Sequence, residues 1–355
     1  MRWVKELLFR SSGGKMEFKA HVSFSLTDRS FINIIKRDIT KLTEGYGFSP
    51  GETGKVNLIV AEMTSNLIKH NAINGEILVK PLSINNIGIE ILCLDKGPGM
   101  SDVSRMLEDG VSTAGTSGEG LGAIRRLSDE FDIYSVREVG TFILARLYKS
   151  RNKPKVAASK KFDVGLIMVP KSGETFCGDG GTMREGIDKC QFLVVDGLGH
   201  GEFAHAASRS AAEAFLKNTN LSPSEIIRNI HPALKHTRGA VGNVAIIDTV
   251  NKTISYCGIG NIAGRIINGA EATKSIISYN GILGHNIPNT INNHELSWSN
   301  NSTLIMHSDG IKSKWDLSRY KDLLRHSPSL VAAVMYKEFS RGTDDTMVLV
   351  CRTRA

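Results

Sequence analysis

Apolar residues recur with helical spacing in one part of the chain and with strand-like spacing in the rest. Between residues 28 and 71 they recur every three to four positions, which predicts helices from Asp28 to about Tyr46 and from about Pro50 to Asn71. Alternating or continuous apolar runs before and after this segment predict strands, and a further helix is expected near 120–130. The predicted strands span 18–26, 76–84, 88–95, 131–138 and 141–148.

The second half has many short apolar runs between turns and fewer helical patterns. Strands are expected at 161–169, 191–196, 243–250, 253–260, 264–268, 302–309 and 346–350, and helices at about 202–218, 223–236 and 328–339. A basic, proline-containing run at 149–161 interrupts the periodicity between the halves. We therefore predict an extension at 1–15, a first domain at 16–149, a linker at 150–160 and a second domain at 161–355.

Composition narrows the class of protein. A chain of 355 residues with 41% hydrophobic and 23% charged residues is typical of a globular protein with two domains. No run of about 18 apolar residues is present, so no membrane span is expected. The net charge is +8, but the basic residues are scattered and aromatic content is 6%, which argues against a nucleic-acid partner. Solubility or an acidic protein partner explains the charge more simply. The cysteines are odd in number, widely spaced and form no CxxC pair, which argues against a disulfide framework and against a zinc site and favours a reducing cytoplasm.

A polar stripe on the second predicted helix is the first candidate site. Glu62, Asn66 and His70 follow one another at four-residue spacing, so they share one helix face. Asn and Glu together can hold Mg²⁺ and orient a nucleophile. A solvated helix face would have the same spacing, and this stripe alone leaves both interpretations open.

Two glycine-rich turns strengthen the interpretation of a ligand site. Asp95 ends an apolar strand in "CLDKGPGM", where Gly97 and Gly99 allow close approach to the backbone and the carboxylate can accept a hydrogen bond from an amine. The second turn, in "TAGTSGEGLGAIRRL", precedes an amphipathic helix whose first backbone amides suit phosphate groups. Its glycines are Gly118, Gly120 and Gly122.

In order and spacing, these stretches over about residues 16–148 resemble the GHKL ATPase family, and within it the anti-sigma-factor serine kinases of the RsbW and RsbT type. "EMTSNLIKH" resembles the N-box, "DKGPGM" the adenine-binding box and "SGEGLGAIRRLSDEFDIYSVREVGT" the ATP lid and the segment after it. The resemblance implies an α/β sandwich that binds ATP and Mg²⁺. It also implies that Asn66 holds Mg²⁺, Glu62 is the general base, Asp95 reads the adenine amine and Thr141 lies near the adenine. The nucleotide pocket would be shaped by Gly97, Gly99, Gly120 and Gly122.

Aspartates in the second half form another candidate site. Each lies beside an apolar strand or a glycine turn, so the set could converge at one end of a sheet. Ligands that are all oxygen suit Mg²⁺ or Mn²⁺ rather than zinc. Asp-Gly pairs also mark ordinary turns, so no single one of them is diagnostic. The set comprises Asp179, Asp196, Asp309, Asp344 and Asp345.

With the motifs "DGLGHG", "GIGN", "SDGI" and "DDTMVLV", residues 161–352 resemble the type 2C metal-dependent protein phosphatases, particularly the SpoIIE and RsbX branch. The resemblance implies an αββα sandwich with two Mn²⁺ or Mg²⁺ ions. One ion would be held by Asp179, Asp196 and the Gly197 carbonyl, with Asp196 bridging to the second ion. The second ion would be held by Asp196, Asp309 and Asp344, with Asp345 as the alternative to Asp344. This branch lacks the arginine that binds phosphate in eukaryotic relatives.

Together these patterns predict a cytoplasmic bacterial partner-switching protein of mixed α/β class. It would join a serine kinase to a phosphoserine/phosphothreonine phosphatase. The resemblance implies that the substrate is a STAS-domain antagonist of an anti-sigma factor, with a sigma factor or signalling complex downstream. The alternative is that the first domain only binds a partner in a nucleotide-dependent manner, and the phosphatase is the sole enzyme. The oligomeric state is left open.

Overall fold

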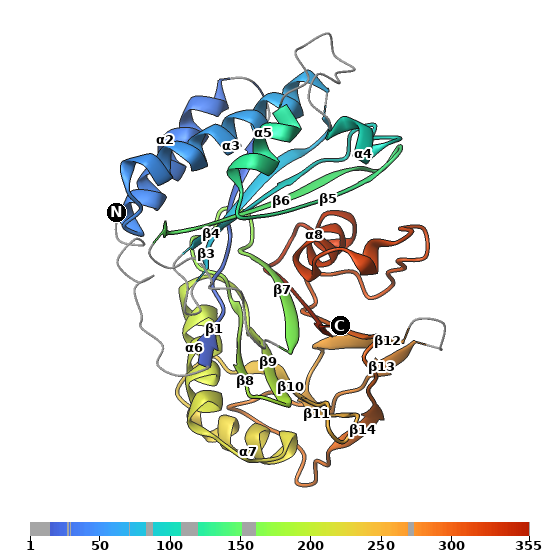
Figure 1. The fold of residues 1–355 in the computed structure, drawn as a ribbon. Coiled ribbons are helices and arrows are strands. Elements are labelled where there is room, and N and C mark those ends of the chain that lie inside the picture. The colour runs from blue at the N-terminus through green and yellow to red at the C-terminus, as the bar shows by residue number, and fades with distance from the viewer. Residues whose placement is uncertain are drawn as a thin grey trace. The chain divides into compact units, whose positions relative to one another are not determined.

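The computed structural model describes residues 15–26, 28, 30–70, 72–82, 88–107, 120–150, 161–268 and 273–354, and its chain forms two compact units. Of the described residues, the first unit contains those between 21 and 150 together with 317–337, and the second contains 15–20, those between 161 and 316, and 338–354. Figure 1 labels the elements of both units. Residues 15–20 and 317–337 thus belong to a different unit from the residues next to them in sequence. The linker pattern at 150–160 does not indicate this assignment.

The first unit is built on a five-stranded antiparallel sheet in the order β2-β3-β4-β6-β5. Its helix α3 starts at a capping box, in which Ser49 Oγ accepts from the Glu52 amide and the Glu52 side chain accepts from the Ser49 amide. The strands are β2 (Val22–Leu26), β3 (Gly75–Leu82), β4 (Gly88–Leu94), β5 (Glu130–Val136) and β6 (Gly140–Tyr148). The helices are α2 (Phe31–Gly45), α3 (Pro50–Lys69), α4 (Val103–Met106), α5 (Gly120–Leu127), η2 (Leu323–Arg325) and α8 (Pro328–Phe339), the last of these as far as Lys337.

Helices α2 and α3 cover one face of this sheet (Figure 1). Ile39, Ile59 and Met63 on the helices are fully buried against Ile77 and Ile91 on the strands. Because strand residues alternate between faces, the odd-numbered positions of β3 and β4 form this apolar core. The even-numbered positions point to the opposite face, which includes charged side chains as well as apolar ones.

A buried charged cluster lies on that opposite face. The Glu90 carboxylate is 2.7 Å from Arg146 Nη2 and 3.1 Å from Lys80 Nζ, and it accepts a hydrogen bond of 3.1 Å from Ser329 Oγ of α8. Nearby, Glu76 accepts from Lys337 Nζ at 2.7 Å. Residues 317–337 therefore complete the first unit through polar contacts with its strands.

The second unit is a pair of antiparallel sheets with a helical layer. One sheet has the order β1-β8-β9-β10-β11-β14 and the other β13-β12-β15-β16-β7. The first sheet contains β1 (Lys15–Glu17), β8 (Asp179–Glu185), β9 (Lys189–Gly197), β10 (Ala240–Asp248), β11 (Thr253–Ile259) and β14 (His294–Ser297). The second contains β7 (Phe162–Val169), β12 (Ala263–Asn268), β13 (Lys274–Ile276), β15 (Ser302–His307) and β16 (Thr346–Thr353). The helices are α6 (Glu202–Lys217) and α7 (Pro223–Ala233).

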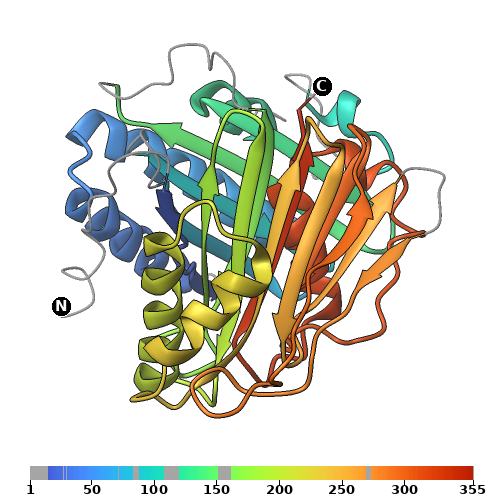
Figure 2. The ribbon, with the colours of Figure 1, turned by 90° about the horizontal axis from the view of Figure 1, so that it is seen from below.

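Side chains from both sheets share one core in this unit. Phe192 and Val194 of β9 pack in the same cluster as Met306 of β15 and Leu349 of β16. Figure 2 shows α6 and α7 beside the first sheet. Phe215 of α6 belongs to a second cluster on that side. This layered packing places the ends of β9, β15 and β16 in one region, which decides where their terminal aspartates lie.

The predicted mixed α/β class is confirmed, but some strand predictions were wrong. The strand expected at 18–26 starts only at Val22, because the Phe18 amide bonds to the Gly181 carbonyl and its ring packs in the core of the second unit. Strand β8 was not anticipated, because its sequence DGGTMRE has little apolar periodicity. No helix in the described ranges is both long enough and apolar enough to cross a bilayer.

Candidate functional site

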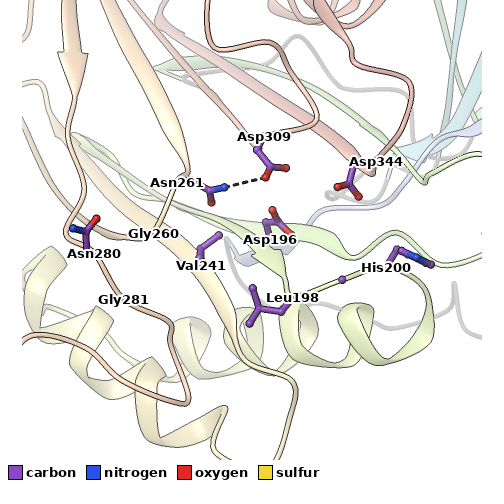
Figure 3. Close-up of a pocket in the computed structure, with 11 residues that line it drawn as sticks. Asp196, Leu198, His200, Val241, Gly260, Asn261, Asn280, Gly281, Asp309 and Asp344 are labelled. Atoms are coloured by element: carbon purple, nitrogen blue, oxygen red, sulfur yellow. Dashed lines mark hydrogen bonds between the residues drawn. The ribbon is translucent and has the colours of Figure 1, made fainter.

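A pocket of about 420 Å³ in the second unit is lined by three of the predicted aspartates, Asp196, Asp309 and Asp344. Their carboxylates point toward one another (Figure 3). Asp196 lies near the end of β9, Asp309 follows β15 and Asp344 precedes β16. Residues that are far apart in sequence are thus brought together by the ends of three strands from two sheets.

Asp179 is paired with Asp196 in the sheet. The two residues are Cα partners in the antiparallel register of β8 and β9, so their side chains leave the same face. Asp179 is buried, and its Oδ2 accepts a hydrogen bond of 2.6 Å from Ser308 Oγ. Ser308 Oγ itself accepts from the Met347 amide at 3.0 Å. The hydroxyl therefore fixes the Asp179 carboxylate from the second sheet.

The structure separates the roles of Asp344 and Asp345. Asp344 is exposed and lines the pocket. Asp345 is 3% exposed, and its two carboxylate oxygens accept from the backbone amides of Lys171 and Gly178 at 2.8 and 2.9 Å. Because both Asp345 oxygens bind backbone amides, Asp345 stabilises the loops around the site, while Asp344 is the one directed at the pocket.

Close backbone packing positions the pocket residues. A Cβ on Gly197 would lie 2.1 Å from the carbonyl oxygen of Ala204 in α6. A Cβ on Gly310 would lie 2.0 Å from the carbonyl oxygen of Asp345. Neither glycine can be enlarged without moving the backbone, so the "DGLG" and "SDGI" motifs are needed sterically as well as for their carboxylates.

The electrostatics of the pocket favour a bound cation. Burial first, and then the charges of Asp309 and Asp344, raise the pKa of Asp196 to about 8. Burial and the neighbouring Asp196 raise the pKa of Asp179 well above its usual range. Over the described ranges, no three Asp, Glu, His or Cys side chains already lie close enough together to hold a metal ion. An ion such as Mg²⁺, which keeps several waters and takes few protein ligands, fits this roomy arrangement.

Two polar residues at this site were not anticipated from the sequence. One is Ser308, which binds Asp179. The other is Asn261, whose side-chain amide donates to Asp309 Oδ2 at 2.9 Å (Figure 3). Asn261 closes the "GIGN" motif and Ser308 immediately precedes Asp309, so both stood inside motifs already singled out. Their contacts could not be predicted, because the sequence does not show which turns lie next to one another in the fold.

The first unit holds the predicted nucleotide-binding residues around Asp95. This carboxyl group is 9% exposed, and burial raises its pKa. Its Oδ1 accepts from the amides of Gly97 and Thr141 at 2.7 and 3.2 Å. No side chain or amide of the described ranges donates to Oδ2, which leaves that oxygen for a ligand. Gly99 has φ +66°, and a Cβ there would lie 2.1 Å from the Val136 carbonyl oxygen.

The polar stripe of α3 meets the start of α5. A Cβ on Gly120 would lie 2.9 Å from Glu62 Oε2 and 3.4 Å from Asn66 Oδ1. The first turn of α5 therefore lies beside these two side chains, at the helix end where backbone amides are free for phosphate. Gly122 is buried in α5. Gly118 lies outside the described residues.

Comparison with known protein families finds two matches. The model of the histidine kinase-like ATPase domain matches residues 27–147, and that of stage II sporulation protein E (SpoIIE) matches residues 187–354. The chain is 34% identical over 100 residues to serine/threonine-protein kinase RsbT of Bacillus subtilis (strain 168), covering 28% of this chain and 74% of RsbT. It is 27% identical over 148 residues to phosphoserine phosphatase RsbX of the same organism, covering 41% of this chain and 73% of RsbX.

A solved structure from work on the bacterial stressosome, a modular system adapted to control secondary messenger signaling, is also similar. It superposes with a TM-score of 0.51 and 27% sequence identity, covering 54% of this chain and all of the other. The likeness to known proteins therefore extends to both halves of the chain.

Proposed function

Because the chain belongs to the family of the RsbT-type kinases in its N-terminal part and has a SpoIIE-type serine/threonine phosphatase domain in its C-terminal part, we propose that it both adds and removes phosphate in a partner-switching pathway. The observation that carries the phosphatase half is the convergence of Asp196, Asp309 and Asp344 on one pocket. The observation that supports the kinase half is that the side chains of Glu62 and Asn66 lie next to the first residue of α5.

In the phosphatase half, Asp179, Asp196 and the Gly197 carbonyl would hold one Mn²⁺ or Mg²⁺ ion. Asp196, Asp309 and Asp344 would hold the second. The raised pKa values of Asp179 and Asp196 support this assignment, because a cation relieves the repulsion that causes part of the shift. When bound, such ions activate water for in-line attack on phosphorus.

In the kinase half, the nucleotide is ATP with Mg²⁺. Asp95 Oδ2 accepts from the adenine amine, Asn66 holds the ion, and Glu62 accepts the proton of the attacking hydroxyl. Thr141 fixes Asp95 through its backbone amide. The glycines at 97, 99, 120 and 122 shape the two turns that border the nucleotide, and a Cβ on Gly99 would collide with the Val136 carbonyl oxygen.

The substrate in this proposal is a STAS-domain antagonist protein, with an anti-sigma factor and a sigma factor further along the pathway. RsbT and RsbX, by name, are a serine/threonine kinase and a phosphoserine phosphatase, which supports a phosphorylated signalling protein as the common substrate. The net charge of +8 suits an acidic partner. All five cysteines are free and buried, which suits a reducing compartment.

The phosphatase half is tested with the full-length protein, Mn²⁺ and a phosphoserine-bearing STAS protein. Wild-type protein should release phosphate, and Asp196→Asn should reduce the rate by several orders of magnitude, because the charge shared by both ions is lost. Excess Mn²⁺ should not restore it. Asp188→Asn is the matched control, since this carboxylate is 41% exposed and pairs with Lys161 away from the pocket. Near wild-type turnover by Asp196→Asn would refute the assignment.

The kinase half is tested in the Asp196→Asn background, so that phosphate added to the substrate is not removed again. Incubation with labelled ATP and unphosphorylated STAS protein should transfer label to a serine or threonine. ATP binding without transfer, together with nucleotide-dependent capture of the STAS protein, would instead support a first domain that only tethers its partner.

A further inference from the structure

The turn before β10 runs beside the metal-site loop. In the register of β9 and β10, Ala240 faces Gly197 and Val241 faces Asp196. The Leu198 amide donates to the Gly239 carbonyl at 3.0 Å, which continues the pairing beyond the strands. Arg238 is the residue immediately before this contact. Its backbone is therefore fixed next to the "DGLG" loop.

The Arg238 guanidinium lies at the edge of the acidic pocket. Gly199 lines the pocket, and a Cβ on Gly199 would lie 3.0 Å from Arg238 Nη1. The guanidinium carbon is 5.0 Å from the ring centre of Phe203, a side chain that is 67% exposed. His285 Nε2 donates to the Arg238 carbonyl at 2.9 Å. Ring and backbone contacts together hold the guanidinium near the pocket opening.

The described residues offer the Arg238 guanidinium no counter-charge that would explain its position. Within the part of the chain that the structure describes, no carboxylate forms an ion pair with its guanidinium. A histidine that lines the pocket, His200, is 2.6 Å from Glu174. The wall of the pocket itself carries Asp196, Asp309 and Asp344. This exposed guanidinium beside the pocket is therefore available to bind an anionic ligand.

The negative charge of a phosphoserine substrate would be bound more tightly with a cation such as Arg238 beside the pocket. A phosphoserine side chain carries a charge of about −1.5 to −2 at neutral pH. The four aspartates assigned to two divalent ions would cancel the charge of those ions, which leaves little net attraction for the phosphoryl group. Arginine is suited to the remaining role, because its planar guanidinium is always charged and binds phosphate oxygens in a bidentate manner.

We propose that Arg238 binds the phosphoryl oxygens of the phosphoserine or phosphothreonine side chain, and that Phe203 keeps the guanidinium turned toward the pocket. The proposal rests on the proposed phosphatase function and adds a substrate-binding residue to it. Arg238 contributes binding and orientation, and it takes no part in activating water.

Steady-state kinetics with p-nitrophenyl phosphate and a phosphoserine peptide, in Mn²⁺, test this role. Arg238→Ala should raise KM and the inhibition constant of inorganic phosphate by about 10-fold to 100-fold, with kcat changed much less, because the lost contact is made before and during the reaction. Arg238→Lys should recover part of the affinity, because charge remains but the bidentate geometry does not. Phe203→Ala should give a smaller increase. Arg209→Ala is the control, since this exposed arginine of α6 pairs with Glu213.

Binding measured without turnover separates this proposal from the phosphatase assignment. Inorganic phosphate is titrated calorimetrically into full-length protein with Mn²⁺, and Arg238→Ala should weaken its binding by the same factor while Arg209→Ala does not. Wild-type protein that binds phosphate through Arg238 but hydrolyses nothing would refute the phosphatase and retain the site. Equal phosphate affinity in wild type and Arg238→Ala, or no phosphate binding by wild type, would overturn the proposal.

Discussion

Asp179 and Asp196 are direct cross-strand partners on β8 and β9, so two carboxylates stand side by side on one face of a buried sheet. Like charges in this arrangement are destabilising unless a proton or a cation separates them. Burial, followed by the charges of Asp309 and Asp344, raises the pKa of Asp196 to about 8, and burial together with the charge of Asp196 raises the pKa of Asp179 well above its usual range. A divalent ion bound between the two carboxylates would reduce their electrostatic repulsion.

The first prediction concerns the stability of the metal-free protein. Folded Asp196 binds a proton up to about pH 8, whereas an unfolded aspartate releases it near pH 4. Its contribution to the free energy of unfolding is therefore fully present below about pH 4 and is lost as pH rises through 8. In chelator, the melting temperature of the second unit should be lower at about pH 9 than at about pH 6.

Two controls accompany that measurement. Asp196→Asn should weaken the pH dependence, while Asp188→Asn should leave it unchanged. Saturating Mn²⁺ should raise the melting temperature more at high pH, because the ion binds deprotonated carboxylates. A metal-free melting temperature that is constant between these pH values would contradict the raised pKa of Asp196.

The second prediction distinguishes two adjacent aspartates. Asp344→Asn should abolish most phosphatase activity with little change in stability, because Asp344 is exposed in the pocket. Asp345→Asn should lower the free energy of unfolding by about 2–3 kcal/mol, because an amide nitrogen would face the Lys171 or Gly178 amide that a carboxylate oxygen now accepts. Chemical denaturation and phosphate release on both variants measure the contrast. The reverse pattern would transfer the ligand role to Asp345.

The third prediction concerns nucleotide affinity. Asp95→Asn should weaken ATP binding by about 1–3 kcal/mol, because a side-chain NH₂ would face the exocyclic amine of adenine in place of the acceptor oxygen Oδ2. Calorimetric titration with Mg²⁺ATP measures the change. Asp38→Asn, on α2 beside Arg37, is the control for loss of one carboxylate in this unit. Unchanged affinity in Asp95→Asn would remove Asp95 from the adenine site.

The fourth prediction separates binding from transfer in the first unit. Glu62→Ala should keep ATP affinity within a few-fold but lose phosphoryl transfer, because a base acts on the attacking hydroxyl during the reaction. Transfer is measured with labelled ATP in the Asp196→Asn background. Persisting transfer would show that Glu62 is only a polar residue of the α3 surface.

The fifth prediction concerns the charged cluster of the first unit. Glu90 is fully buried and contacts both Arg146 and Lys80, so Glu90→Ala leaves two buried cations without their shared partner. The unit should lose about 3–5 kcal/mol of stability in denaturant titration. Glu130→Gln should cost about 1 kcal/mol or less, because Glu130 contacts the same arginine but is 43% exposed. If the two variants lost equal amounts of unfolding free energy, burial would not explain the contribution of Glu90 to stability.

The sequence by itself determined the class of fold and predicted the chemistry of both candidate sites. Helical spacing located α2 and α3 because an amphipathic helix needs one apolar face, whatever it packs against. The aspartates of "DGLGHG", "SDGI" and "DDTMVLV" indicated hard-metal chemistry because oxygen ligands and glycine turns can be read locally. Strand β8 was missed for the converse reason, since Gly180 packs closely against Ser208 of α6 and Gly181 against the Leu193 carbonyl of β9, which leaves no apolar alternation to detect.

Tertiary structure alone decided which of these residues meet and which of two neighbours faces the pocket. The register that pairs Asp179 with Asp196 depends on strand alignment, and a shift by one residue would turn the two side chains to opposite faces. Asp344 and Asp345 are chemically identical in sequence, and only the amides of Lys171 and Gly178 distinguish them. The place of Arg238 beside Gly199 likewise follows from the pairing of β9 with β10. Contacts between residues distant in sequence depend on how the whole chain packs, so local sequence patterns do not predict them.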